Sequence, residues 1–98
     1  MLTSRRAAYS DMDYNGHVNN ARYVQWIQDA LPAAEIEGAE SMRLDINFLS
    51  ELKYDNRVDL FGAPINGQGY HGYAIEGRSE GNGRIDAAAF RAELRLNP

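Results

Sequence analysis

A single helical segment followed only by strand-like segments is the feature that most narrows the fold of this 98-residue chain. Val24, Ile27 and Leu31 recur at the spacing that places apolar side chains on one face of a helix, which predicts a helix over residues 19–31. Pro32 ends this helix, because proline lacks a backbone N–H donor and disfavours helical geometry in the residue before it. One helix must therefore cover whatever sheet the rest of the chain forms.

The hydrophobic period changes to two after residue 40. Residues 42–48 alternate apolar with polar side chains, which predicts a strand over residues 42–52 with one buried and one wet face. Turn-forming residues at 54–57, 66–69 and 81–83 divide the remaining sequence. The other predicted strands are residues 3–10, a strand that begins with residues 58–61, residues 70–76 and residues 85–96.

One helix and five strands in this order predict an α+β fold in which the helix lies on the concave face of an antiparallel sheet. The length favours a single domain over residues 1–98. A chain this short buries only about 60–65% of the surface that its unfolded form exposes. We therefore expect a partner subunit or domain to cover apolar surface that the single domain leaves exposed to solvent.

Composition excludes several classes of function. The net charge of −4 argues against a nucleic-acid partner, since phosphate binding needs a basic surface. The absence of cysteine excludes disulfides, thiolate metal sites and a cysteine nucleophile. We find no membrane-spanning stretch and no secretory signal, and we expect a cytoplasmic location. If an anionic carrier docks here, the basic candidates are Arg5, Arg6, Arg22, Lys53 and Arg57.

Residues 11–22 contain the richest cluster of polar residues. Asp11, Asp13, Asn15 and Gly16 match the start of an EF-hand calcium loop. The twelfth position of such a loop requires a bidentate Glu and is Arg22 here, so we expect no metal at this place.

The same loop suggests a second chemistry. Asp13, Asn15 and His17 alternate along the chain, and in extended backbone such residues project to one side. A carboxylate, an amide and an imidazole would then converge beside a helix N-terminus, whose free N–H groups and positive potential suit a developing oxyanion. Spacing alone leaves a structural alternative open, because loops before helices are commonly rich in Asp and Asn for capping and turn formation.

Residues 11–23, Asp-Met-Asp-Tyr-Asn-Gly-His-Val-Asn-Asn-Ala-Arg-Tyr, resemble the signature of hotdog thioesterases. The resemblance is nearest to the second hotdog domain of plant-type and bacterial acyl-ACP thioesterases, and Tyr23–Ile27 resembles the start of that family's helix. It covers residues 5–31 well and residues 42–54 less closely. It implies a hotdog fold, a five-stranded antiparallel sheet wrapped around one long helix.

The resemblance also implies hydrolysis of a fatty acyl thioester, without a cofactor. Glu51 looks like the family's carboxylate at the end of the strand after the helix, where it would act as general base or as nucleophile. His17 would move the proton, Asn15 would orient the nucleophile or polarise the carbonyl, and Asp13 would hold both in place. Some family members carry Cys after this Glu, whereas this chain has Leu52.

Val18, Asn19 and Asn20 are the expected substrate-binding residues. The backbone N–H groups near Val18 and Asn19 would receive the oxyanion. The alternative for Asn19 and Asn20 is a capping role, since an Asn side chain readily accepts a free N–H of the first helical turn.

The chain departs from the resembled family in one respect, because those enzymes carry two hotdog domains and this sequence has one. We expect a homodimer or pairing with a second hotdog domain. The expected substrate is an acyl carrier protein or coenzyme A thioester. Two alternatives to an acyl-ACP thioesterase remain open: a single-hotdog acyl-CoA thioesterase, and a non-catalytic dimerisation or scaffold domain of a larger enzyme.

Overall fold

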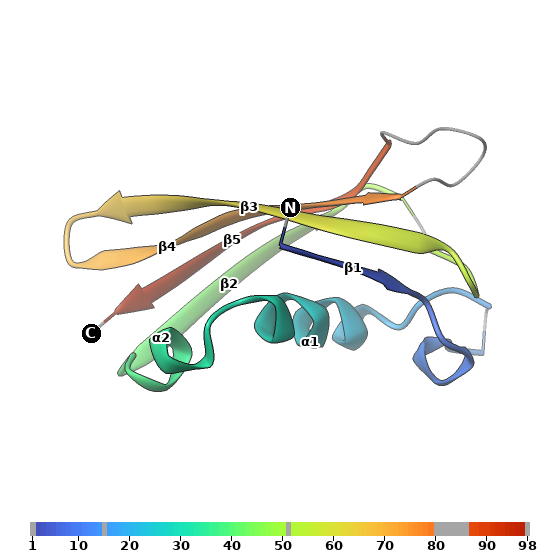
Figure 1. The fold of residues 1–98 in the computed structure, drawn as a ribbon, viewed down its shortest axis with the longest axis horizontal. Coiled ribbons are helices and arrows are strands. Elements are labelled where there is room, and N and C mark those ends of the chain that lie inside the picture. The colour runs from blue at the N-terminus through green and yellow to red at the C-terminus, as the bar shows by residue number, and fades with distance from the viewer. Residues whose placement is uncertain (1, 15, 51, 80–86, 98) are drawn as a thin grey trace.

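Five antiparallel strands form one sheet, and a long helix lies against one of its faces (Figure 1). The structure is a computed structural model that describes residues 2–14, 16–50, 52–79 and 87–97. The strand order is β1-β3-β4-β5-β2, which confirms the predicted sheet. In chain order the elements are β1 (Thr3–Arg6), the 3-10 turn η1 (Tyr9–Asp11), α1 (Asn20–Ala30), α2 (Ala33–Glu37), β2 (Ser41–Phe48), β3 (Arg57–Gly67), β4 (Tyr70–Ser79) and β5 (Ala87–Asn97).

The core lies between α1 and the concave face of the sheet. Tyr23, Trp26 and Ile27 are the buried residues of α1. The centroid of the Tyr23 ring lies 5.4 Å from that of Trp26 and 5.2 Å from that of Phe90 on β5. Both pairs are edge to face, which is favourable for aromatic rings. Of the predicted apolar stripe, Ile27 is buried, whereas Val24 is only half-buried. The helix is therefore rotated slightly toward its aromatic side.

β4 and β5 approach each other closely at Gly72. A Cβ atom at this position would lie 1.7 Å from the carbonyl oxygen of Leu94. We expect Gly72→Ala to lower the free energy of unfolding by about 3 kcal/mol, because backbone must move to admit the methyl group. Urea denaturation measures this. Gly62→Ala is the matched control, since its Cβ meets only the end of the Leu2 side chain, and equal midpoints for the two variants would contradict the prediction.

The first strand is shorter than predicted, because β1 ends at Arg6 and not at residue 10. The Asp11 carboxylate accepts a hydrogen bond from the Ala8 N–H (2.8 Å), which stabilises the turn η1 instead of further strand. Ala7 is held by the loop before β3, donating to the Asn56 carbonyl (2.9 Å) and accepting from the Asp55 N–H (2.8 Å). The positive φ of Asp55 (66°) makes this loop a tight turn, in agreement with the predicted turn at 54–57.

The predicted helix end at Pro32 is confirmed, but a second short helix, α2, follows at once. Proline is tolerated at the start of a helix, where its missing N–H is not needed. Tyr73 on β4 donates a hydrogen bond to Glu35, which fixes α2 to the sheet and raises the pKa of the Tyr73 hydroxyl. One proline therefore ends one helix and begins the next.

β2 ends at Phe48, four residues before the predicted end. The N–H groups of Leu49 and Ser50 both donate to the Ala89 carbonyl, at 2.9 and 3.1 Å. Two donors on one acceptor break the regular ladder, so the chain leaves the sheet here. The predicted hairpin turn at 81–83 lies outside the described residues.

Charged side chains line the other face of the sheet. Glu76 accepts hydrogen bonds from Arg78 (2.6 Å) and Arg91 (3.1 Å), and these bonds, chiefly the one from Arg78, hold the pKa of its carboxyl below the ordinary value. Such a ladder of ion pairs is typical of a solvated surface. Among the described residues, no helix is long and apolar enough to cross a membrane.

Candidate active site

The loop before α1 is a narrow hairpin closed by a bridge between Met12 and Val18. The Asp13 N–H donates to the His17 carbonyl (2.9 Å), and the Asp13 carboxylate accepts from the His17 N–H (3.3 Å). Gly16 takes a positive φ of 76°, which glycine adopts without strain. Asp13 thus holds the backbone that carries the imidazole.

A second set of hydrogen bonds attaches this loop to its neighbours. The Val18 N–H donates to the Leu52 carbonyl (2.8 Å), and the Asn19 N–H donates to the Asp11 carbonyl (2.9 Å). Both donors are therefore already engaged within the protein. The expectation that these two N–H groups receive the oxyanion does not hold in this conformation.

Asn19 is the N-cap of α1, and its side chain accepts the Ala21 N–H at 3.0 Å. The capping alternative is thus confirmed for this residue, while Asn20 begins the helix. We expect Asn19→Ala to lower the free energy of unfolding by about 1 kcal/mol, because one first-turn donor loses its partner. Thermal or urea denaturation measures this. Asn19→Asp should retain most of the stability, and an alanine variant as stable as wild type would contradict the assignment.

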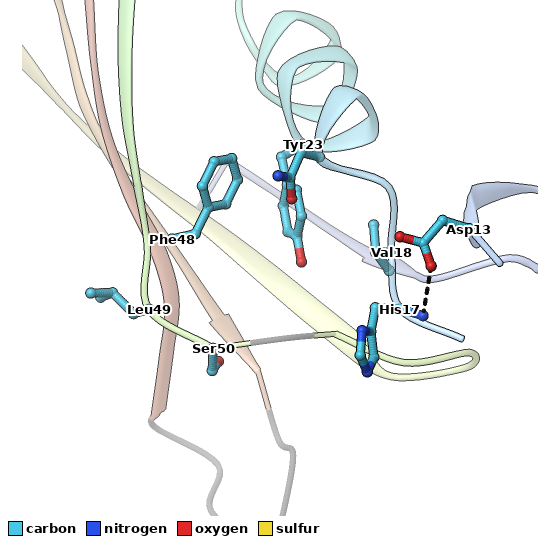
Figure 2. Close-up of a pocket in the computed structure, with 8 residues that line it drawn as sticks. Asp13, His17, Val18, Tyr23, Phe48, Leu49 and Ser50 are labelled. Atoms are coloured by element: carbon cyan, nitrogen blue, oxygen red, sulfur yellow. Dashed lines mark hydrogen bonds between the residues drawn. The ribbon is translucent and has the colours of Figure 1, made fainter. Parts of the chain in front are cut away.

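A cavity of about 430 Å³ opens beside this hairpin (Figure 2). Figure 2 shows the His17 ring and the Ser50 side chain on opposite sides of it, with the Tyr23 hydroxyl pointing toward the space between them. His17 is half-buried and Tyr23 is buried. The residues that line the cavity are Asp13, His17, Val18, Asn20, Tyr23, Phe48, Leu49 and Ser50.

The cavity brings together two segments that are distant in sequence. One is the hairpin with the first turn of α1, and the other is the end of β2 through Ser50. Four predicted site residues line it: Asp13, His17, Val18 and Asn20. Asn15 and Glu51 lie outside the described residues. Ser50 lines the cavity, and the Leu52 carbonyl accepts the Val18 N–H of the hairpin.

Tyr23 is a cavity residue that the sequence did not assign to the site. Its ring belongs to the core, with its centroid 5.3 Å from that of the Phe48 ring, and its hydroxyl points into the cavity. Its place as the last residue of the 11–23 motif, in the first turn of the helix, is the only signal in the sequence. Phe48, Leu49 and Ser50 were also missed, because their position depends on how β2 leaves the sheet.

The lining has the chemistry of a site for an apolar substrate with a reactive polar group. It combines aromatic and aliphatic side chains with a carboxylate, an imidazole, an amide and two hydroxyls. Within the described parts of the chain, no group of three His, Asp or Glu side chains is arranged to hold a metal ion.

Comparison with solved structures confirms the hotdog fold. An acyl-ACP thioesterase from Bacteroides thetaiotaomicron superposes with a TM-score of 0.77 at 21% identity, over 95% of this chain and 35% of that one. A 4-hydroxybenzoyl-CoA thioesterase variant bound to 4-hydroxybenzoyl-CoA superposes with a TM-score of 0.77 at 17% identity, over 97% of this chain and 81% of that one.

Sequence comparison identifies the family. The oleoyl-acyl carrier protein thioesterase of Coriandrum sativum is 32% identical over 63 residues, which cover 64% of this chain and 16% of the relative. An acyl-[acyl-carrier-protein] hydrolase of Cuphea viscosissima is 32% identical over 63% of this chain and 15% of its own length. The chain thus spans a small part of these relatives. The sequence model described as "Acyl-ACP thioesterase C-terminal domain" matches residues 3–90, so the chain belongs to the acyl-ACP thioesterase C-terminal domain family.

Proposed function

We propose that this domain carries a thioester-hydrolysing site that acts on fatty acyl-ACP and releases a free fatty acid and the carrier thiol. The observation that carries the proposal is the cavity that Asp13 and His17 line together with Phe48, Leu49 and Ser50. The family supports acyl-ACP as the substrate class.

In the proposed reaction, Glu51 removes a proton from water, and the water oxygen forms a bond to the thioester carbonyl carbon. The C–S bond then breaks, and His17 relays the proton that Glu51 took from water to the leaving sulfur. Direct attack by the Glu51 carboxylate is the alternative, in which water later hydrolyses the acyl-enzyme anhydride. Asn15 orients the nucleophile or the carbonyl in either case, and Asp13 fixes the hairpin through its bond to the His17 N–H.

The acyl chain is proposed to lie along the apolar wall of the cavity, formed by Val18, Tyr23, Phe48 and Leu49. Since Phe48 and Leu49 remain 44% and 45% exposed, this wall is open on the β2 side. A second hotdog domain or a second copy of the chain is proposed to close it.

Parallel assays on acyl-ACP and acyl-CoA of the same chain length test the proposal. The chain contains no cysteine, so a thiol reagent reports only the released carrier thiol. We expect turnover with a higher kcat/KM for acyl-ACP. A preference for acyl-CoA would favour the single-hotdog acyl-CoA thioesterase, and absence of turnover on both would favour a scaffold domain.

A further inference from the structure

Tyr23 places a hydroxyl in the active-site cavity, and the proposed reaction gives that hydroxyl no role. The residue is only 2% exposed. The ring centroids of Trp26, Phe48 and Phe90 lie 5.4, 5.3 and 5.2 Å from that of Tyr23. Aromatic packing therefore holds the ring, and with it the position of the hydroxyl oxygen.

The core does not explain why this ring carries a hydroxyl. A phenylalanine would make the same aromatic contacts, because these involve the ring alone. The Tyr23 hydroxyl points instead toward the space between the His17 ring and Ser50 (Figure 2). Since His17 is proposed to act on the thioester, the hydroxyl is directed at the place where the reacting group would bind.

The backbone at the start of α1 offers few donors to an oxyanion. The N–H groups of Val18 and Asn19 donate to carbonyl oxygens of the protein. Those of Ala21 and Arg22 donate to Asn19, to its side chain at 3.0 Å and to its carbonyl at 2.9 Å. From Val18 to Arg22, the Asn20 N–H alone lacks an acceptor within the described part of the chain.

A side chain can supply what the backbone lacks. Oxyanion sites are built from backbone N–H groups and from side-chain donors, tyrosine among them. Asn20 and Tyr23 lie three residues apart in α1, which places them on one face of the helix, and both line the cavity. The Tyr23 hydroxyl is therefore a donor available from the same turn of the helix.

We infer that the Tyr23 hydroxyl is a catalytic group that donates a hydrogen bond to the thioester carbonyl oxygen, an inference that rests on the proposed function. When the attacking oxygen forms its bond to the carbonyl carbon, the π electrons of C=O move to the carbonyl oxygen. The Tyr23 O–H stabilises that charge and keeps its proton. When the C–S bond breaks, the electron pair re-forms C=O, and the proton taken from water reaches the sulfur through Glu51 and His17.

Burial strengthens this interaction. The hydroxyl is shielded from bulk water, where a hydrogen bond to charge is stronger, and a donor fixed by packing needs no reorganisation as the charge develops. It binds the oxyanion more tightly than the neutral carbonyl, so it lowers the barrier of the chemical step more than it improves substrate binding. The expected signature of the hydroxyl is an effect on kcat with little effect on KM.

Tyr23→Phe removes the hydroxyl and retains the ring. We expect kcat for acyl-ACP to fall about a hundredfold with little change in KM, as for the loss of one oxyanion donor. The midpoint of urea denaturation should stay close to that of wild type, because the aromatic contacts remain. An unchanged kcat would overturn the inference and leave the oxyanion to the backbone, and a raised KM alone would overturn it in favour of a binding role.

Tyr73→Phe is the matched control, because it deletes the same group from a tyrosine outside the cavity. The Tyr73 hydroxyl donates to Glu35 of α2, so this variant should lower the urea midpoint and leave kcat unchanged. Tyr23→Phe should do the reverse. Equal losses of kcat in the two variants would mean that either lost hydroxyl disturbs the domain, and this would overturn the inference.

A binding measurement tests the hydroxyl without turnover. A long-chain trifluoromethyl ketone takes up water and forms a tetrahedral hydrate that resembles the reaction intermediate, whereas the methyl ketone of the same length stays planar. Tyr23→Phe should weaken the trifluoromethyl ketone about tenfold and leave the methyl ketone unchanged. If the variant does not fold, the wild-type Tyr23 ring resonances decide by NMR. A shift with the trifluoromethyl ketone alone supports the inference, and an equal response to both ketones overturns it.

The inference and the proposed function fail separately. Binding of the trifluoromethyl ketone that depends on Tyr23, without hydrolysis of acyl-ACP or acyl-CoA, would remove the function and keep the hydroxyl as a donor to a tetrahedral oxygen. Hydrolysis with a kcat that Tyr23→Phe does not change would overturn the inference and keep the function. The absence of both hydrolysis and a Tyr23-dependent response would overturn both.

Discussion

His17→Ala is expected to lower the rate of acyl-thioester hydrolysis by at least about a hundredfold while the domain stays folded. Proton transfer by a positioned side chain typically contributes 10²–10⁴-fold to a rate. The His17 ring lines the cavity, whereas the hairpin is held through the backbone of His17 and Asp13, which the substitution retains. The thiol-release assay gives kcat, and denaturation gives the stability of the variant.

The second histidine of the chain provides the control. His71 is an exposed residue of β4, opposite Asn66 on β3 and away from the cavity, so His71→Ala should leave kcat unchanged. Glu51→Gln should cause a loss as large as that of His17→Ala, if the two groups act in one proton transfer. Retention of more than half of the wild-type kcat by His17→Ala would remove the imidazole from the proposed mechanism.

The parts of this site that are local in sequence were predictable. The Asp13–Asn20 loop, the helix that follows it and its end at Pro32 all depend on capping and on the geometry of glycine and proline. Asp13 holds the backbone of His17, and Asn19 caps α1. Such contacts join residues only a few positions apart, so sequence spacing already contains them.

The parts that depend on tertiary packing could not be predicted. Phe48 and Ser50 reach the cavity only because the chain leaves the sheet where Leu49 and Ser50 share the Ala89 carbonyl. Tyr23 has the spacing of a core residue, and its ring is in the core, but its hydroxyl reaches the cavity. The engagement of the Val18 N–H by the Leu52 carbonyl likewise joins residues far apart in sequence.

Charge reversal on β2 is expected to convert a dimer of this domain into monomers. β2 is an edge strand that pairs only with β5 among the described strands, and Met42 and Phe48 on it are 41% and 44% exposed. An unpaired edge with apolar side chains and no proline favours pairing with another strand. Within the chain, Arg43 lies opposite Arg95, and Asp45 lies opposite Glu93. Like charges directly opposite each other are unfavourable, and these side chains pair instead along their own strands, Arg43 with Asp45 (3.0 Å) and Arg95 with Glu93 (2.6 Å).

The sequence of β2 is complementary to itself in one antiparallel register. When two copies pair about a twofold axis at Leu44, Arg43 lies opposite Asp45 of the partner subunit. In the same register Met42 lies opposite Ile46 of the partner subunit, so the apolar face of the strand continues across the junction. Directly opposed residues share a face of the sheet, so this register keeps charges on the outer face and apolar side chains on the inner face.

Two single variants and their mixture test this register. Arg43→Asp places two carboxylates opposite each other at two symmetric positions, and Asp45→Arg does the same with two guanidinium groups. Each variant alone should dimerise at least about a hundredfold more weakly than wild type, because like charges at an interface cost several kcal/mol. Mixing the two should restore a heterodimer, since every opposed pair is then complementary. Light scattering at several concentrations measures the dissociation constants.

The double variant Arg43→Asp with Asp45→Arg separates register from charge content, because its composition equals that of wild type and its opposed pairs are complementary again. It should dimerise as wild type does. A wild-type chain that stays monomeric, or a mixture as weak as its components, would contradict pairing through β2.

The register also sets what the partner brings to the site. Phe48 lies opposite Glu40 of the partner subunit, so the partner's chain would extend along the open wall of the cavity at Phe48 and Leu49. Loss of the dimer should therefore weaken binding of the acyl chain as well. The monomeric variants should show a raised KM, and the heterodimer should return KM to the wild-type value.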